Sequence, residues 1–297
     1  MKSNCPRLSR LATWAALIAL TISCHSRALA EDGAEGEGEP VLLRYKFDKG
    51  EEVLTKVTHI ATTKTKIRGN VQESKSRAIS TKVWRIVDID DKGNIEFEHL
   101  VSDVEMWQKV TGRDEVRYNS RKDDKPPLQY EHASKSIGKV IASLTITPTG
   151  KIVARKNNLP EHDMGLGPIA TPLPEEPVQV GQRWVVPSEV TVRIKDSFKR
   201  IQTRKTFRLL SVKTGVATIE VKTQVLTPVD EPEIEAQLMQ QLTNGKMKFD
   251  IDAGRVISKE MDWDETVVGF SGADSMMEYL ARFQEEIAPN RTARRPE

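Results

Sequence analysis

Two segments of this chain are rich in basic residues, and their charge and spacing suit the binding of an anion. Residues 64–85 contain seven lysines and arginines and one acid, and residues 193–208 show the same seven to one. Both segments alternate like β-strands, so each is expected to form a basic ribbon that attracts an anionic partner. The expected anion-binding residues are Lys64, Lys66, Arg68, Lys75, Arg77, Arg193, Lys195, Lys199, Arg200, Arg204 and Lys205.

The basic ribbons also have a purely structural interpretation. Lysine on a strand prevents edge-to-edge pairing between sheets, so a basic face also protects against aggregation. If the ribbons do bind, a lipid, a glycan or an acidic envelope protein is the expected partner. Nucleic acid is not expected, because aromatic residues do not alternate with the basic ones as they do in single-strand binders.

Other reactive groups do not form recognisable catalytic or metal-binding patterns. The histidines after residue 30 (His59, His99, His132 and His162) have no metal-ligand spacing. The segment 88–93 resembles a calcium loop, but Lys92 stands at the fifth position and His99 at the twelfth, where ligand oxygens are required. We interpret this segment as a hairpin turn. The sequence therefore predicts no catalytic residue, no metal ligand and no cofactor.

The first thirty residues have the pattern of a secretory signal peptide. Basic residues precede an apolar run from 11 to 22, and the small-x-small motif at 28–30 predicts cleavage after Ala30. The run is too short for a membrane span, so no transmembrane segment is expected after cleavage. Lipidation at Cys24 is the alternative. The chain is thus expected to be exported, to the periplasm or beyond the cell.

Removal of residues 1–30 changes the composition of the chain. This segment holds four of the 45 basic residues and none of the 43 acidic ones, so 41 basic residues face 43 acidic ones and the net charge becomes −2. Both cysteines, Cys5 and Cys24, also lie there. The mature chain would have no disulfide, cysteine nucleophile or thiolate site. We expect a disordered leader at 31–40 and a basic tail at 288–297.

The remaining chain has the pattern of an internal repeat, in which one β-rich unit occurs twice. Residues 81–87 (TKVWRIV) return as 204–210 (RKTFRLL), and residues 150–156 (GKIVARK) return as 254–260 (GRVISKE). The fold class is therefore mainly β (α+β), with two approximate repeats of long antiparallel meander strands. Each repeat has a covering helix and a closing hairpin, and the two form either separate lobes or one continuous sheet.

The expected elements follow from period-two alternation, helical spacing and turn residues. Repeat 1 spans 41–159 and repeat 2 spans 178–287, with a proline-rich linker at 160–177. Strands are expected at 51–68, 74–90, 95–110, 144–147, 151–156, 183–195, 198–213, 216–227, 248–251 and 255–263. Helices are expected at 131–143, 233–243 and, as a C-terminal helix, 273–287. Trp84, Trp107, Trp184 and Trp263 are expected core residues, or else they line an apolar cavity.

Four short motifs carry a resemblance to a known family. They are Phe-Asp-Lys-Gly at 47–50, Val-Gly-Gln-Arg-Trp at 180–184, and the hairpins Gly-Lys-Ile-Val at 150–153 and Gly-Arg-Val-Ile at 254–257. Over most of 41–270 the chain resembles exported, β-rich bacterial proteins of unknown function that are common in planctomycetes. The resemblance implies no catalytic residues. A looser similarity of fold links the chain to the half-barrels of periplasmic lipoprotein carriers.

These patterns favour a non-catalytic, exported protein of the cell envelope that binds or carries an apolar or anionic ligand. Two alternatives remain open. The first is a structural or interaction protein whose sheets dock a protein partner without holding a small ligand, and the second is an uncharacterised hydrolase. An apolar cavity inside the sheet distinguishes the carrier from the structural or interaction protein.

Overall fold

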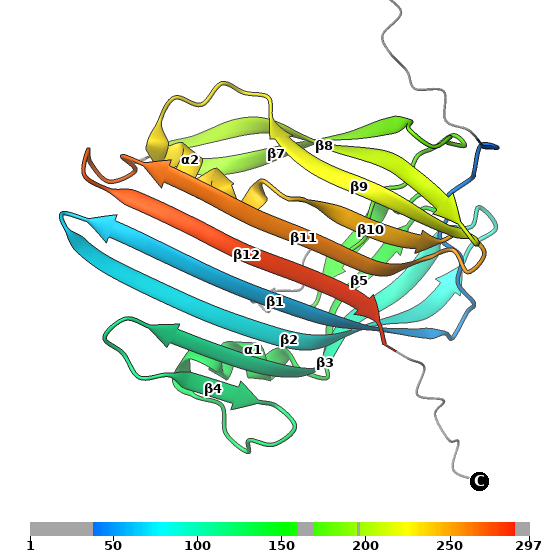
Figure 1. Ribbon diagram of the computed structural model, residues 1–297. Coiled ribbons are helices and arrows are strands. Elements are labelled where there is room, and N and C mark those ends of the chain that lie inside the picture. Colours follow the sequence, from blue (N-terminus) through cyan, green and yellow to red (C-terminus); the bar gives the residue numbers. More distant parts are fainter. Residues whose placement is uncertain (1–37, 160–168, 195–196, 289–297) are drawn as a thin grey trace, which may run out of the picture. The chain divides into compact units, whose positions relative to one another are not determined.

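Long neighbouring strands form a single twelve-stranded antiparallel sheet (Figure 1). The computed structural model describes residues 38–159, 169–194 and 197–288, all within one unit, Ala34–Glu297. The strand order is β6-β5-β3-β2-β1-β12-β11-β10-β9-β8-β7, and β4 pairs with β3 beside this path. The mainly β prediction is confirmed, and the choice between two lobes and one sheet is settled in favour of one sheet.

The strands fall into two meanders. The first contains β1 (Glu52–Ile67), β2 (Asn70–Ile89), β3 (Ile95–Val110), β4 (Val116–Asn119), β5 (Val140–Ile146) and β6 (Ile152–Asn157). The second contains β7 (Arg183–Ile194), β8 (Ser197–Lys213), β9 (Val216–Val225), β10 (Asn244–Asp250), β11 (Arg255–Val268) and β12 (Met276–Ile287). Pairing of β1 with β12 joins them. The segments that match in sequence lie on β2 and β8, and on β6 and β11.

Tight turns set the register of the longest hairpins. Arg68 and Gly69 both have positive φ, 50° and 80°, between β1 and β2, and Thr214 and Gly215 repeat this with 47° and 75° between β8 and β9. Two central residues with positive φ match the twist of the strands they connect. The interpretation of 88–93 as a hairpin turn is confirmed, because the Asp90 carboxylate accepts hydrogen bonds from nearby backbone amides.

Short helices interrupt each meander at the corresponding place. In the first, the 3₁₀ turn η1 (Leu128–Tyr130) and helix α1 (Glu131–Ser136) precede β5. In the second, α2 (Pro232–Leu238) and the 3₁₀ turn η2 (Met239–Gln241) precede β10. The helix expected at 131–143 was predicted too long. Ile137 is extended, Gly138 has a φ of 73°, and the chain enters β5 two residues later.

The C-terminal helix expected at 273–287 is wrong, because residues 276–287 form β12. Met277, Leu280 and Phe283 fit helical spacing, but the same segment also alternates, with Tyr279, Phe283 and Glu285 buried on one face. As a strand it satisfies the backbone groups of both β1 and β11. A helix there would leave two long strand edges without a partner.

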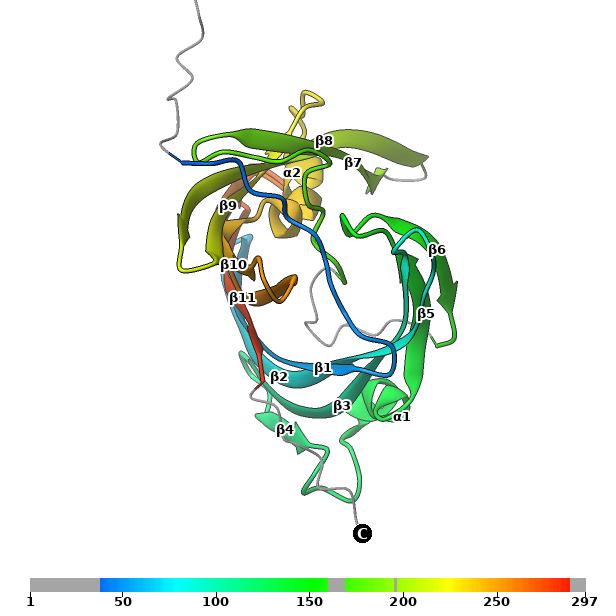
Figure 2. The same ribbon diagram turned by 90° about the vertical axis from the view of Figure 1, so that its right-hand side faces the viewer.

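The sheet curves, and its concave face holds the core (Figure 2). The largest group of buried apolar residues includes Trp84, Phe97, Phe207 and Phe249. At one end, residues 41–47 cross the concave face and pack into this core (Figure 2). Their backbone joins two hairpin turns, because the amide of Tyr45 donates to Pro148 and that of Lys46 donates to Gly254.

The remaining boundary predictions concern the linker and the termini. In the described part of the expected linker, Leu173 is buried in the same core, and the indole of Trp184 donates to the carbonyl of Pro172. Residues 1–37, 160–168 and 289–297 lie outside the described residues, so the signal peptide, Cys24 and Ala30 stay predictions. Among the residues that are described, the helices are all too short to cross a bilayer.

Candidate functional site

Three buried charged residues meet on the concave face of the sheet. Lys82 on β2 and Lys259 on β11 both contact the carboxylate of Glu285 on β12, with 3.1 Å between Lys259 Nζ and Glu285 Oε2. All three are buried, at 2%, 5% and 7% exposure. Burying charges is costly unless each has a partner, and here one carboxylate bridges two ammonium groups. We call these three residues the ion cluster.

The ion cluster keeps Glu285 ionised. Burial alone would raise the pKa of its carboxyl group, but Lys259 and Lys82 outweigh burial and lower this pKa to about 2. Lys82 and Lys259 thus share a single carboxylate, and burial lowers the pKa of the Lys82 ammonium group. Sequence analysis misses this arrangement, because the expected helix at 273–287 includes Glu285 and the basic segment 64–85 includes Lys82 only as one of its cations.

Lys205 adds a further cation nearby. It lies on β8, two residues after Thr203 and two before Phe207. Every second residue of a strand points to the same face, so the Lys205 side chain lies on the concave face with those two residues. Burial lowers the pKa of the Lys205 ammonium group, and repulsion from Lys259 lowers it further. Among the residues that the structure describes, no carboxylate forms an ion pair with Lys205.

Lys205 and Lys259 both line a cavity of about 480 Å³. We call it the apolar cavity, because most of its wall is hydrophobic. Strands β7, β8, β9, β11 and β12, the residues after α2, and residues 170–172 form this wall. The lining residues are Ala170, Thr171, Pro172, Val186, Ser188, Lys205, Phe207, Val221, Gln240, Gln241, Thr243, Lys259, Met261, Trp263 and Phe283.

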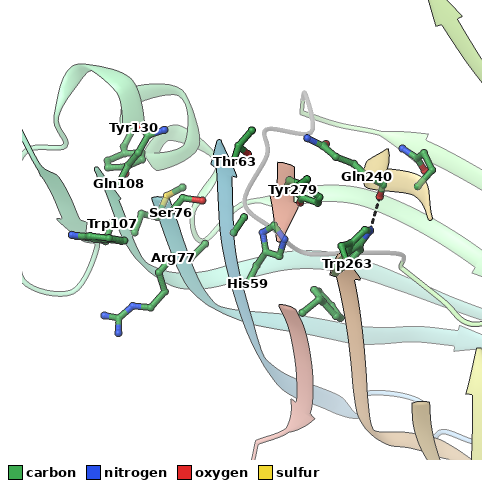
Figure 3. A pocket seen from close by; sticks show the side chains of 15 residues that line it. His59, Thr63, Ser76, Arg77, Trp107, Gln108, Tyr130, Gln240, Trp263 and Tyr279 are labelled. Atoms are coloured by element: carbon green, nitrogen blue, oxygen red, sulfur yellow. Dashed lines mark hydrogen bonds between the residues drawn. The ribbon is translucent and has the colours of Figure 1, made fainter. Parts of the chain in front are cut away.

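A second cavity of about 550 Å³ adjoins the first. We call it the polar cavity, since His59, Thr63, Ser76 and Gln108 contribute to its wall (Figure 3). Residues Gln240, Gln241, Trp263 and Phe283 line both cavities. Figure 3 shows the Trp263 indole donating to the Gln240 carbonyl, at 2.9 Å between Nε1 and the oxygen. Trp263 therefore stands at the boundary between the two spaces.

Three of the four tryptophans after residue 30 illustrate different positions relative to the core and the cavities. Trp84 is a core residue that stacks on Phe97, with 4.4 Å between ring centroids. Trp184 is half-buried and stacks on Phe207, with 5.3 Å between centroids. Trp263 fits the alternative expectation of a cavity-lining residue.

His99 is a buried histidine whose imidazole is influenced by Lys82 and Glu285 of the ion cluster. It lies opposite Trp84 in the β2–β3 ladder and is only 2% exposed. Burial and the positive charge of Lys82 lower the pKa of its imidazole to about 4. His99 is therefore neutral near pH 7. No cluster of three or more potential metal ligands occurs within the described ranges.

The two basic segments do not form one continuous surface. Lys64, Lys66, Lys75 and Arg77 lie on β1 and β2, whereas Arg193, Lys199, Arg200, Arg204 and Lys205 lie on β7 and β8. Strands β9 to β12 separate the two groups in the sheet. Arg68 lies in the β1–β2 turn, and Lys195 is outside the described residues. Anion binding by these ribbons stays a prediction.

Acids on the same strand or on neighbouring segments form ion pairs with several of the basic residues. Most of these ion pairs are largely exposed and weak. The pairs are Lys64–Glu278 at 3.5 Å, Lys75–Glu73 at 2.9 Å, Arg77–Glu105 at 2.6 Å, Lys199–Glu231 at 3.4 Å and Arg200–Glu189 at 3.5 Å. Lys205 differs from these residues because it faces the cavity. It is thus the predicted anion-binding residue with the most specific surroundings.

Comparisons with known proteins find only remote structural likeness. No protein-family model matches the sequence, and no curated protein matches it. A structure titled "Lipid-protein interactions in lipovitellin" is 9% identical, with a TM-score of 0.46, over 85% of this chain and 26% of that one. DynF from the dynemicin biosynthesis pathway of Micromonospora chersina is 7% identical, with a TM-score of 0.22, over 85% of this chain and 92% of that one. At these values the likenesses carry no inference about function.

Proposed function

We propose that this protein is a non-catalytic binding or carrier protein that holds an apolar ligand in the apolar cavity. The single observation that carries the proposal is the cavity itself, about 480 Å³ in volume and walled mainly by apolar and aromatic side chains. Ligand sites are commonly concave, mostly apolar and about 300–1,000 Å³ in volume, with a few polar groups that orient the ligand.

Two further features support this function. The signal-like first thirty residues favour action outside the cytoplasm, where apolar molecules need a carrier to cross water. The ionisable groups of the ion cluster are held in mutual contacts, which suits a structural role better than proton transfer.

The test is to fill the cavity and measure binding of a neutral fluorescent probe, N-phenyl-1-naphthylamine. Val186 lines the cavity from β7, whereas Val185 is 51% exposed on the opposite face of the same strand. Val186→Trp should weaken probe binding about tenfold or more, because the indole occupies the ligand volume. Val185→Trp is the matched control and should bind like the original protein.

Two results would overturn the proposal. Either the unmodified protein fails to bind the probe, or both tryptophan variants bind it equally well while remaining folded by circular dichroism. Native mass spectrometry of protein from its own envelope fraction complements the probe. A reproducible extra mass that is absent from Val186→Trp would identify the natural ligand.

A further inference from the structure

The charges beside the apolar cavity are unbalanced. Lys82, Lys259 and Lys205 lie in or next to it, and Glu285 is the only carboxylate among the described residues that line the cavity or belong to the ion cluster. A cation that is removed from water without a partner is costly to a protein. Glu285 offsets this cost for the buried Lys82 and Lys259, whereas the half-buried Lys205 has no ion-pair partner among the described residues.

The neighbours of Lys205 do not supply the missing charge. Across the ladders it faces Val186 on β7 and Thr223 on β9, and the Thr223 hydroxyl is already hydrogen-bonded to that of Thr243, at 2.8 Å between the oxygens. The charged group that shares the cavity with it is another cation, Lys259. An anion in the cavity would therefore stabilise both ammonium groups.

We propose that the ligand is a long-chain carboxylate, whose head group pairs with Lys205 beside Lys259 and whose chain lies against the apolar wall. The inference rests on the proposed function and names its ligand class. Phe207 is the next residue on the same face of β8, and Met261 is the next on the same face of β11. Each lysine thus has an apolar neighbour that lines the same cavity.

Glu285 indicates why the head group is a carboxylate. Its two oxygens already lie between two lysines on this concave face, one contact to each. Lys82, Glu285 and Lys259 already alternate as cation, anion and cation. A ligand carboxylate between Lys259 and Lys205 would continue this alternation. Ion-paired hydrogen bonds of this kind are the strong ones in partly buried sites.

The experiment compares ligands that share a chain and differ in the head group. Palmitate, hexadecanol and hexadecyl phosphate compete for the delipidated protein against N-phenyl-1-naphthylamine. Palmitate should displace the probe at a concentration about tenfold lower than hexadecanol does, as expected for one charge-assisted contact. In Lys205→Met this preference should fall to about threefold or less, when each displacement is referred to the affinity of that variant for the probe.

Lys222→Met is the matched control. Lys222 lies on the neighbouring strand β9, and its side chain is 56% exposed, next to Glu220. This variant should keep the full preference for palmitate. Lys205→Arg retains the positive charge and should keep most of the preference for palmitate over hexadecanol. This variant shows whether any substitution at position 205 reduces the preference.

The possible failures are distinguishable. Equal displacement by palmitate and hexadecanol in the unmodified protein would refute the carboxylate and leave the apolar carrier intact. Tighter binding of hexadecyl phosphate than of palmitate would reassign the head group to a phosphate and overturn this inference. If the probe itself does not bind, the proposed function fails and this inference fails with it.

A second readout does not depend on a folded variant. Nuclear magnetic resonance of isotope-labelled lysine ammonium groups can follow the titration of Lys205 in the unmodified protein. Added palmitate should raise the pKa of Lys205 toward its ordinary value, because the carboxylate favours the charged form. Hexadecanol should not raise it. No change with palmitate would contradict the proposed contact.

Discussion

Lys82 and Glu285 are 203 positions apart in the sequence, yet they form a buried ion pair across β1 on the concave face. The contact spans the two meanders, because Lys82 belongs to the first and Glu285 to the second. It depends on β12 pairing with β1, the step that joins the meanders into one sheet. The ion pair can therefore form only when the two meanders are joined into one sheet.

We predict that Glu285→Gln strongly destabilises the protein. The substitution leaves Lys82 and Lys259 buried together without a counter-charge, and removal of one partner from a buried pair costs about 3–5 kcal/mol. The free energy of unfolding, measured in urea at pH 7, should fall by this amount. Glu278→Gln on the same strand is the control, because the exposed pair it removes with Lys64 is worth about 1 kcal/mol or less. Equal losses for both variants would contradict the prediction.

We predict that stability falls as pH decreases from about 6.5 to about 4, through His99. The pKa of its imidazole is lowered to about 4 in the folded state, so the unfolded chain binds the extra proton first. The stabilisation from neutral His99 is complete above pH 6.5 and is lost by pH 4, to a total of about 3 kcal/mol. The lowered pKa of Glu285 adds to the loss only at the acid end of this window, because its stabilisation begins to disappear where the unfolded carboxyl takes up a proton, near its ordinary pKa of 4.5.

The measurement is the unfolding free energy of the protein and of His99→Leu at several pH values between 4 and 7. The charged groups that influence His99 are Lys82, Glu285 and Arg155, and all remain in the variant. His99→Leu should therefore have a shallower pH dependence in this range. The same slope in both proteins would show that another group is responsible.

Much of the sheet was predictable from sequence because alternation and turn residues are local signals. The strands expected at 95–110 and 183–195 are found at Ile95–Val110 and Arg183–Ile194. Segment 273–287 was ambiguous locally, since its apolar residues satisfy both periods. The tertiary requirement to pair two strand edges decided it, and a local pattern contains no information about those edges.

The candidate site was much less predictable. Lys205 was singled out for its charge, but the neighbouring Arg204 points to the opposite face and bonds to Gln224. Which of two adjacent cations enters a cavity depends on the register of a whole strand. Glu285 and the cavity required contacts between strands that are distant in sequence. No short motif describes such a site.

We predict that Gly254→Ala loosens residues 41–47. Gly254 has a φ of 63°, and an added Cβ would lie 2.6 Å from the amide nitrogen of Lys46, which donates to the Gly254 carbonyl. The substitution should cost about 2 kcal/mol or more, because it combines backbone strain with a clash. Gly69→Ala is the control, since its φ is 80° but no atom lies within 4 Å of the added Cβ.

Hydrogen exchange at the Lys46 and Tyr45 amides measures this loosening. Both amides donate to hairpin turns in the folded protein. Exchange should become faster in Gly254→Ala by more than the global loss of stability explains, and Gly69→Ala should show only the global effect. Unchanged local protection in Gly254→Ala would mean that residues 41–47 adjust to the extra methyl group.

We predict that Trp263→Ala joins the two cavities and shifts the preference of the protein toward longer ligands. Trp263 lines both the apolar and the polar cavity, and its indole is held by the Gln240 carbonyl. Removal of the indole opens the boundary, so chains that exceed the apolar cavity gain room in the second space. Affinities for laurate, palmitate and behenate, measured by probe displacement, should shift in favour of behenate.

Trp184→Ala is the control. It removes an indole that stacks on Phe207 and is absent from the wall of both cavities, so it should not change the order of preference. If Trp263→Ala keeps the original order, the two spaces do not act as one binding site.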